Sequence, residues 1–470
     1  MSATGPDEAR PAIHFVSLGC PKNRVDTEVM LGVSARAGYR HVDDPHAAEV
    51  IVVNTCGFVE AAKQESIETV LELAELKQQG LCRTLIMTGC LSQRYAGELA
   101  QGLPEVDHFL GSSDMLALGA LLGESPGARV QVGNPANYLV GADDPRILSG
   151  SRASAYVKIA EGCSRRCAFC AIPSFRGKLR SRPVADVARE VQRLTEAGTA
   201  EINLISQDTV SYGRDLPAGE DLLALLERLE SIATLRWLRL FYLYPEALPD
   251  ALLERLAGHG KLVPYLDMPL QHASSAMLKR MHRGYDADRI GRLLERVRTA
   301  APGVTIRTAF IVGHPGETDA DFQALMELVQ RERFDHVGLF RYSPEEGTSS
   351  HDQDGAVPEA VIEERLTSLS EVQHSIAREK LSAQVGQVLE VLVEGLSEES
   401  ELLLQGRHRG QAPEVDGVVL LTDDEAKVGS LRRARVTQSG DYDLIASLLP
   451  ESEDRQATAT AAGKRLPLLD

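Results

Sequence analysis

The segment Cys163-Ser-Arg-Arg-Cys167-Ala-Phe-Cys170 places three cysteines on one short stretch of chain, with the spacing Cys-x3-Cys-x2-Cys. It follows an apolar run over residues 155–159 that is typical of a buried strand. Three thiolates at this spacing can hold three irons of a 4Fe-4S cluster, which leaves the fourth iron open to a small molecule. A structural zinc site is disfavoured, because it needs four protein ligands and no fourth Cys or His follows at a short distance.

The cysteine segment opens a section, residues 153–382, in which strands and helices alternate. Apolar runs predict strands over 155–159, 201–205, 237–242, 262–268, 304–312 and 336–342. Helical spacing of apolar residues predicts helices between them, over 184–197, 222–232, 287–300 and 319–331. Six such repeats indicate an incomplete parallel (βα)6 barrel, which a helix over 358–381 would close.

The first section, residues 13–125, shows the same alternation and predicts an open parallel α/β domain. Apolar runs at 13–18, 50–53 and 84–87 predict buried strands, and a helix is expected over 61–78. The predicted strands run into Cys20, Cys56 and Cys90. Because parallel strands end at the same edge of a sheet, we expect these thiols to converge on a metal site. Three ordinary buried cysteines are the alternative, and Cys82 is expected to take no part.

The remaining residues divide into a linker, a third domain and a tail. Residues 126–152 are rich in Pro and Gly and predict a linker. Residues 383–450 contain short β-rich runs, which predict a small antiparallel β-barrel. These runs cover 388–393, 402–405, 417–421 and 431–436. The tail, residues 451–470, lacks any pattern and is expected to be disordered.

Composition and charge are those of a large globular protein. The 470 residues are 43% hydrophobic, and 50 basic against 68 acidic residues give a net charge of −18. A chain this acidic is a poor partner for nucleic acid over a broad surface. It has no apolar run long enough for a membrane span, and its polar start does not resemble a secretory signal, so we expect a cytoplasmic protein. An odd number of cysteines, seven, favours metal or redox chemistry over disulfides.

The cysteine segment resembles that of the radical S-adenosyl-L-methionine (SAM) superfamily. Phe169 stands where that superfamily often has an aromatic residue, and Gly313-His-Pro315-Gly316-Glu-Thr is similar to its Gly-x-Pro-Gly-Glu-Thr turn. The resemblance implies that SAM binds the open iron and is cleaved to methionine and a radical that abstracts hydrogen. Expected cofactor contacts are Phe169, Gln207, Gly313, Pro315 and Gly316. A polar strand end is the alternative interpretation of Gln207, and His314 is expected to be an ordinary loop residue.

The order of the three domains resembles that of the methylthiotransferases over residues 13–450, with a TRAM-like barrel at the end. The resemblance implies that a first 4Fe-4S cluster is held by Cys163, Cys167 and Cys170 and a second by Cys20, Cys56 and Cys90. It also implies a reaction with two SAM molecules, in which a C–H bond becomes C–S–CH3. An external reductant and a sulfur donor are expected as partners, and no catalytic side chain beyond the cluster ligands is assigned.

Two branches of that family differ in substrate. One modifies the β-carbon of an aspartate of ribosomal protein S12, free or in the small ribosomal subunit, and the other modifies an adenosine next to the anticodon of tRNA. The stretches 160–163, 173–183 and 412–417 resemble the first branch. Twelve acidic against six basic residues over 387–450 also favour a basic protein partner.

A basic run beside the cysteine segment is the contrary observation. It consists of Arg165, Arg166, Arg176, Lys178, Arg180 and Arg182. These side chains could contact RNA, an aspartate substrate or the SAM carboxylate, so direct nucleic-acid binding stays open but is not favoured. Two other classes of protein explain fewer of these features. An iron–sulfur electron carrier would not need the predicted (βα)6 barrel, and a zinc-dependent hydrolase would be expected to contain His-Glu-x-x-His, which this sequence lacks.

Overall fold

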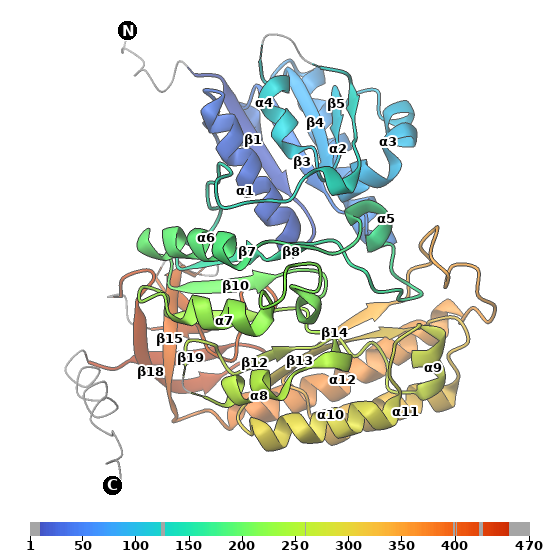
Figure 1. Cartoon of the computed structure of the whole chain (residues 1–470), viewed down its shortest axis with the longest axis vertical. Helices are drawn as coiled ribbons and strands as arrows, with labels where there is room; N and C mark the ends of the chain where they lie inside the picture. Colours follow the sequence, from blue (N-terminus) through green and yellow to red (C-terminus); the bar gives the residue numbers. More distant parts are fainter. Residues whose placement is uncertain are drawn as a thin grey trace.

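The computed structural model of the chain describes residues 10–123, 127–258, 260–397, 400, 402–422 and 426–450. It has the expected α/β architecture, with an N-terminal sheet at one end, a central set of parallel strands and a C-terminal barrel beside them (Figure 1). The tail predicted to be disordered, residues 451–470, lies outside the described residues. No helix in the described ranges is long and apolar enough to cross a membrane.

The N-terminal part is a parallel sheet of six strands in the order β2-β1-β3-β4-β5-β6. The strands are β1 (Ala12–Ser17), β2 (Arg40–His41), β3 (Val50–Thr55), β4 (Thr84–Gly89), β5 (His108–Leu110) and β6 (Val130–Gln131). Helices α2 (Glu60–Gln78) and α3 (Cys90–Gly102) pack on one face, and α1 (Pro21–Arg36) and α4 (Leu118–Leu121) on the other. The segment expected as a linker thus contributes β6, which pairs with β5. Every residue of β3 is buried, because helices cover both faces.

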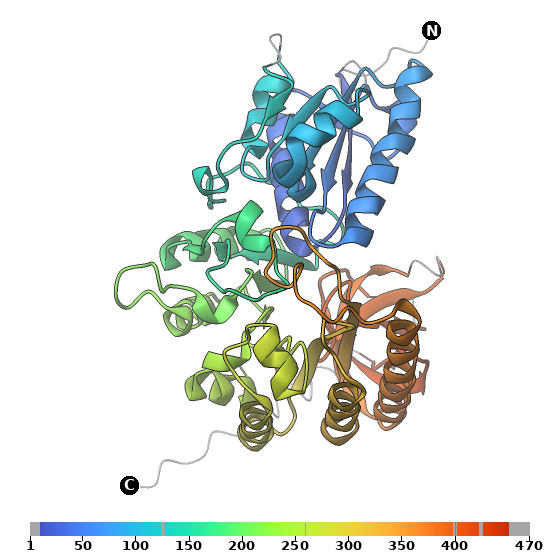
Figure 2. The same ribbon diagram turned by 90° about the vertical axis from the view of Figure 1, so that its right-hand side faces the viewer.

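The central part contains six parallel strands that follow one another in chain order. They are β7 (Ser154–Lys158), β10 (Glu201–Ile205), β11 (Trp237–Leu240), β12 (Tyr265–Asp267), β13 (Thr305–Val312) and β14 (His336–Arg341). They pair as two sheets of three, and a bridge between Leu238 and Leu262 connects the sheets. The longer helices that separate the strands or follow the last one are α6 (Val184–Glu196), α7 (Leu222–Glu230), α8 (Asp250–Ala257), α10 (Ala287–Ala300), α11 (Asp319–Glu332) and α12 (Glu359–Ser382). Their buried leucines and valines form one core with the strands. The arrangement of strands and helices confirms the incomplete barrel (Figure 2).

Two strands are shorter than the apolar runs suggest. The run 262–268 contains Pro264, which has no N–H to give to a sheet, and only β12 remains after it. The run 237–242 ends at Leu240, and Tyr242 follows with a positive φ of 59°. In both places the backbone ends a strand that hydrophobicity alone would extend.

The C-terminal part is a closed barrel of five strands. They are β15 (Val388–Leu396), β16 (Leu404–His408), β17 (Val419–Leu421), β18 (Leu431–Ser439) and β19 (Leu444–Leu448). All neighbours are antiparallel except β17 and β19, whose parallel pairing closes the barrel. The last strand, β19, has no counterpart among the predicted runs.

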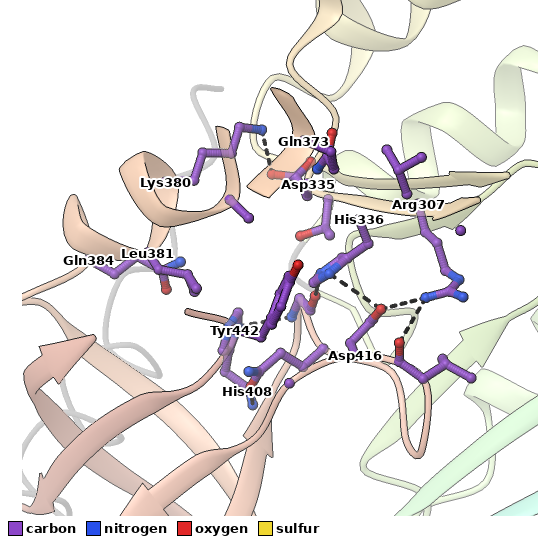
Figure 3. Close-up of a pocket in the computed structure, with 18 of the residues that line it drawn as sticks. Arg307, Asp335, His336, Gln373, Lys380, Leu381, Gln384, His408, Asp416 and Tyr442 are labelled. Carbon is purple, nitrogen blue, oxygen red and sulfur yellow. Dashed lines mark hydrogen bonds and ion pairs between the residues drawn. The ribbon is translucent and has the colours of Figure 1, made fainter. Parts of the chain in front are cut away.

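A cavity of about 480 Å³ separates this barrel from α12 and β14 (Figure 3). At its edge, Asp416 accepts hydrogen bonds from Arg307 Nη1 at 2.7 Å and from Tyr265 Oη at 2.7 Å. Burial alone would raise the pKa of Asp416, but neighbouring His336 and Arg307 lower it below its ordinary value. An ionised carboxylate of the C-terminal barrel is therefore anchored in the central part.

Candidate metal and cofactor centre

All six cysteines predicted as cluster ligands line one cavity of about 400 Å³ between the N-terminal and central parts. Cys20 caps α1, Cys56 follows β3, and Cys90 begins α3. Since β1, β3 and β4 are adjacent and parallel, their ends bring these three thiols to one edge of the sheet. Cys82 does not line this cavity, and its Sγ lies 3.3 Å from the carbonyl oxygen of Thr84.

Two glycines allow the strand ends to approach so closely. Gly19 has a φ of +93°, and a Cβ there would lie 2.8 Å from Cβ of Cys56. Gly89 has a φ of +97°, and a Cβ there would lie 2.3 Å from Oδ1 of Asn54. A side chain at either position would push neighbouring strand ends apart, so the local sequence Gly-Cys is a requirement of this packing.

The other three cysteines lie on the segment between β8 (Ala160–Glu161) and α5 (Ile172–Arg176). The backbone of this segment is anchored at several points. Cys163 N donates to the carbonyl of Gly177 at 3.0 Å, and Ala168 N donates to that of Met281 at 2.9 Å. The segment is therefore held against the central strands, with its thiols directed to the same cavity as the N-terminal trio.

A guanidinium group contacts one sulfur atom of each trio. Arg176 places Nη2 3.1 Å and Nε 3.2 Å from Sγ of Cys90, and Arg283 places Nη1 3.1 Å from Sγ of Cys167. Both arginines are more than nine-tenths buried. Buried cations of this kind stabilise negative charge nearby, and thiolates bound to an iron–sulfur cluster would supply it.

The chemistry of the donors fits two iron–sulfur clusters. Burial raises the pKa of Cys90 and Cys163 to about 11, and that of Cys56 and Cys170 to about 12. These thiols are protonated at neutral pH without a metal, so metal binding must release protons. Among the described residues, no three His, Cys, Asp or Glu side chains are grouped so as to hold a single metal ion. The fit to clusters rests on two sets of three soft ligands in one cavity with cations against them.

A buried network fixes the two trios relative to each other. Arg176 Nη1 lies 2.9 Å from Oδ2 of Asp26 on α1 and 3.3 Å from Oε2 of Glu161 on β8. Lys158 on β7 contacts both carboxylates as well. Burial would raise the pKa of Glu161, but the neighbouring cations Lys158 and Arg176 bring it well below its ordinary value. The four charges hold α1 against the first strands of the barrel.

Of the five residues predicted to contact the cofactor, two line the cavity and three do not. Phe169 and Gln207 line the cavity, and Oε1 of Gln207 is buried with no hydrogen-bond partner in the described residues. An acceptor left open in this way fits a cofactor with hydrogen-bond donors. Gly313, Pro315 and Gly316 are not among the lining residues. They form the turn after β13, where a Cβ on Gly313 would lie 2.5 Å from Cδ1 of Ile362 on α12. Their contact with SAM stays a prediction.

Three residues that sequence reasoning missed also line the cavity: Lys22, Tyr242 and Arg283. Lys22 is 7% exposed, and its Nζ lies 3.0 Å from the ring centroid of Tyr242. Burial lowers the pKa of Lys22 to about 8. Proximity to Cys20 could have marked Lys22, whereas no local pattern marks Arg283, which is 116 residues from Cys167 in the chain.

The basic run beside the cysteine segment does not form a continuous positive surface. Arg176 and Arg182 are buried against carboxylates, and Arg165 contacts Asp208 at 2.7 Å. Arg166 and Lys178 are exposed. Half of the run, Arg165, Arg176 and Arg182, therefore neutralises acidic groups of the same chain.

Several of the acidic residues counted over 387–450 form ion pairs within the chain, whereas the sequence favoured contact with a basic partner. Glu398, Glu399, Glu401, Asp423, Asp424 and Glu425 lie outside the described residues. Glu394 and Asp416 bind arginines within the chain, and Glu390 lies 3.5 Å from Arg409. These groups are paired within the chain, so the charge count alone does not describe a surface for a partner.

Comparisons with known proteins cover nearly the whole chain. The model of the uncharacterised protein family UPF0004 matches residues 12–111, that of the radical SAM superfamily matches 157–329, and that of the TRAM domain matches 385–449. The ribosomal protein uS12 methylthiotransferase RimO of Sorangium cellulosum is 55% identical over 447 residues, 94% of this chain and 91% of that protein. The protein of the same name from Anaeromyxobacter sp. (strain K) is 47% identical, over 96% of both chains.

Among solved structures, the radical SAM methyltransferase TsrM from Kitasatospora setae, with cobalamin and a 4Fe-4S cluster bound, is similar with a TM-score of 0.52. The match covers 73% of this chain and 77% of that one at 15% sequence identity. At this identity the likeness concerns the fold.

Proposed function

Because the chain belongs to the RimO family of ribosomal protein uS12 methylthiotransferases, we propose that it methylthiolates the β-carbon of an aspartate of ribosomal protein S12. The reaction uses two SAM molecules and two 4Fe-4S clusters. The observation that carries the proposal is the convergence of two separate trios of cysteines on one cavity. Cofactors held at the two trios would reach a single substrate carbon from the same cavity.

Each part of the chain has a role in this proposal. In the central domain, residues 153–382, Cys163, Cys167 and Cys170 hold the cluster that binds SAM. In the N-terminal domain, residues 13–125, Cys20, Cys56 and Cys90 hold the second. When bound, SAM and the clusters supply the radical that removes a hydrogen and the methylated sulfur that replaces it.

The protein contributes positioning and charge. Arg176 and Arg283 donate to ligand sulfurs and offset the negative charge of the clusters. Phe169, Gln207, Gly313, Pro315 and Gly316 contact SAM, and the C-terminal barrel, residues 383–450, contacts S12. We place the enzyme in the cytoplasm, where an external reductant and a sulfur donor supply electrons and sulfur.

The proposal is tested with the full chain, reconstituted with iron and sulfide without oxygen and supplied with SAM, dithionite and purified S12. Mass spectrometry of S12 should show one methylthio group in place of a hydrogen on an aspartate. If S12 is unchanged while tRNA from the same assay gains a methylthio-adenosine, the substrate assignment is wrong and the fold and clusters stand.

Removal of one cysteine ligand should abolish a different activity in each trio. Cys163→Ala should abolish formation of 5′-deoxyadenosine, because SAM then has no iron to bind. Cys56→Ala should still cleave SAM but should not methylthiolate S12, and each variant should hold about half of the iron of the unchanged chain. Cys82→Ala, outside the cavity, is the control and should keep both activities. Retained sulfur insertion in Cys56→Ala would contradict the two-cluster assignment.

A further inference from the structure

The side chain of Lys22 is buried at the cavity, and no carboxylate among the described residues forms an ion pair with its ammonium group. Lys22 belongs to the first turn of α1, two residues after Cys20, and its side chain lines the cavity shared by the six cysteines. It is 7% exposed. In the part of the chain that the structure describes, no hydrogen bond or ion pair engages Nζ, which lies 3.0 Å from the ring centroid of Tyr242. A buried cation in this situation is unfavourable unless an anion joins it.

The surroundings of Lys22 hold it ready for such an anion. Tyr242, just beyond β11, has a φ of +59°, and its N–H donates to Oδ2 of Asp267 at 3.0 Å, which holds the backbone of Tyr242 in place. The ring supports the ammonium through a cation–π contact. The buried carboxylates of Asp267 and Glu161 are engaged by other groups, Glu161 by Lys158 at 2.7 Å. The N–H groups of Lys22 therefore remain for a ligand that enters the cavity.

We propose that Lys22 binds the side-chain carboxylate of the aspartate that is modified. This inference rests on the proposed function and names a substrate-binding residue for it. The carboxylate carbon of an aspartate is bonded to its β-carbon, so an ion pair at Lys22 places the reacting carbon one bond from a fixed group. Lys22 follows Cys20 on α1, which puts this anchor on the side of the trio that holds the second cluster.

The same contact selects for the substrate class. An adenine base presents no anionic group, and a neutral amide in place of the carboxylate would leave the buried ammonium unpaired. A carboxylate of SAM has the same chemistry, but SAM is expected at the other trio, on the central domain. The experiment must therefore separate the peptide carboxylate from that of SAM.

Binding of two labelled peptides to the reconstituted full chain tests the proposal. The peptides span the modified aspartate of S12, and one carries Asn at that position. The unchanged protein should bind the Asp peptide about tenfold more tightly than the Asn peptide, or better, by fluorescence anisotropy. Lys22→Met, similar in size and neutral, should bind both peptides equally. Lys279→Met removes an exposed lysine of α9 (Ser275–Arg280) and should keep the preference.

The outcomes separate this inference from the proposed function. Lys22→Met with an intact preference for Asp overturns the inference, while methylthiolation of S12 by the unchanged chain would still support the function. Loss of SAM affinity in Lys22→Met, measured without peptide, also overturns it, because the cation would then hold SAM. If the unchanged protein neither prefers the Asp peptide nor modifies S12, both the inference about Lys22 and the proposed function are wrong. Iron content and thermal unfolding of each variant show whether it is folded, and a purely structural defect would weaken both peptides alike.

Discussion

Single side chains at this site act mainly through burial and charge. Arg176 and Arg283 bring positive charge to sulfur atoms inside the protein, where a unit charge acts far more strongly than in water. His314, in contrast, is buried as a neutral group. Its Nδ1 lies 3.1 Å from the carbonyl oxygen of Pro315, which can only accept, so Nδ1 carries the proton and Nε2 accepts from Ser350 Oγ at 2.8 Å.

The burial of His314 predicts acid sensitivity. Burial lowers its pKa to about 4 from an ordinary value of 6.5. Below about pH 6.5 the unfolded chain binds a proton at this position and the folded chain does not. The free energy of unfolding therefore falls as the pH drops from 6.5 towards 4. His314→Gln keeps an acceptor for Ser350 and does not titrate. Its free energy of unfolding, measured on cluster-free protein, should fall less between pH 7 and pH 5 than that of the unchanged chain.

The matched control is His351→Gln, which replaces an exposed histidine close to Ser350 in the chain. This variant should keep the original pH dependence. An identical slope in His314→Gln and in the unchanged chain would show that burial of His314 does not govern the acid response.

The ends of β1, β3 and β4 build half of the cysteine site. They do so because β3 and β4 end directly before a cysteine and β1 ends three residues before one, and because Gly19 and Gly89 take backbone conformations that other residues avoid. Helix α1 begins directly after Cys20 and α3 begins at Cys90, whereas α2 begins at Glu60, four residues after Cys56. Position along an element, rather than any single contact, thus brings the three sulfurs together.

Gly89→Ala tests this dependence on the strand end. The added Cβ would lie 2.3 Å from Asn54 and 2.6 Å from the Thr55 carbonyl oxygen, at a φ of +97°. We expect a loss of roughly 1–3 kcal/mol in stability from the backbone alone. Displacement of Cys90 should cost about half of the bound iron, measured by iron analysis after reconstitution.

Gly97→Ala in the same helix, α3, is the control. A Cβ there meets no atom within 4 Å, and alanine favours a helix over glycine by about 1 kcal/mol. This variant should bind iron normally and unfold at the same or a slightly higher temperature. Equal iron content in both variants would refute the role of Gly89.

Taken together, the three parts are joined by buried ion pairs between domains. Arg407 of the C-terminal barrel contacts Glu201 on β10 and Glu394 on β15, and Arg239 Nε lies 3.0 Å from Glu201. Trp237, the one tryptophan of the sequence, is fully buried beside them and reports on this interface. The arrangement explains how a small barrel is held rigidly against the catalytic part.

Glu201→Gln should release this interface. The change leaves two buried arginines short of a negative charge, which costs about 3–5 kcal/mol. Burial would raise the pKa of Glu201, but Arg407 and Arg239 lower it to about 2, below the ordinary 4.5. The stabilisation is therefore complete above about pH 4.5 and is lost as the pH falls from 4.5 towards 2. Urea unfolding at pH 7, followed by Trp237 fluorescence, measures the loss.

Glu379→Gln removes an exposed ion pair with Arg333 and is the control. Such pairs contribute about 0–1 kcal/mol. If both variants unfold at the same urea concentration, the buried pairs do not hold the C-terminal barrel.

Much of this protein follows from local pattern. The alternation of strands and helices, the spacing of Cys163, Cys167 and Cys170, and the position of Cys20, Cys56 and Cys90 after predicted strands are properties of neighbouring residues. Hydrophobic periodicity and thiol spacing act over a few residues, so they can be read along the chain. Pro264 is also a local feature that accounts for the short β12, although the apolar run 262–268 alone predicts a longer strand.

Other features depend on residues that are far apart in the chain. The meeting of the two trios, the contact of Arg283 with Cys167, and Lys22 over Tyr242 arise from packing between elements. The same packing pairs Arg176 of the basic run with Asp26, and Glu394 of the acidic barrel with Arg407, which a count of charges could not show. Local preference selects helices, strands and turns, but burial and pairing of charge are determined by the folded chain, because they depend on which distant groups share a low-dielectric interior.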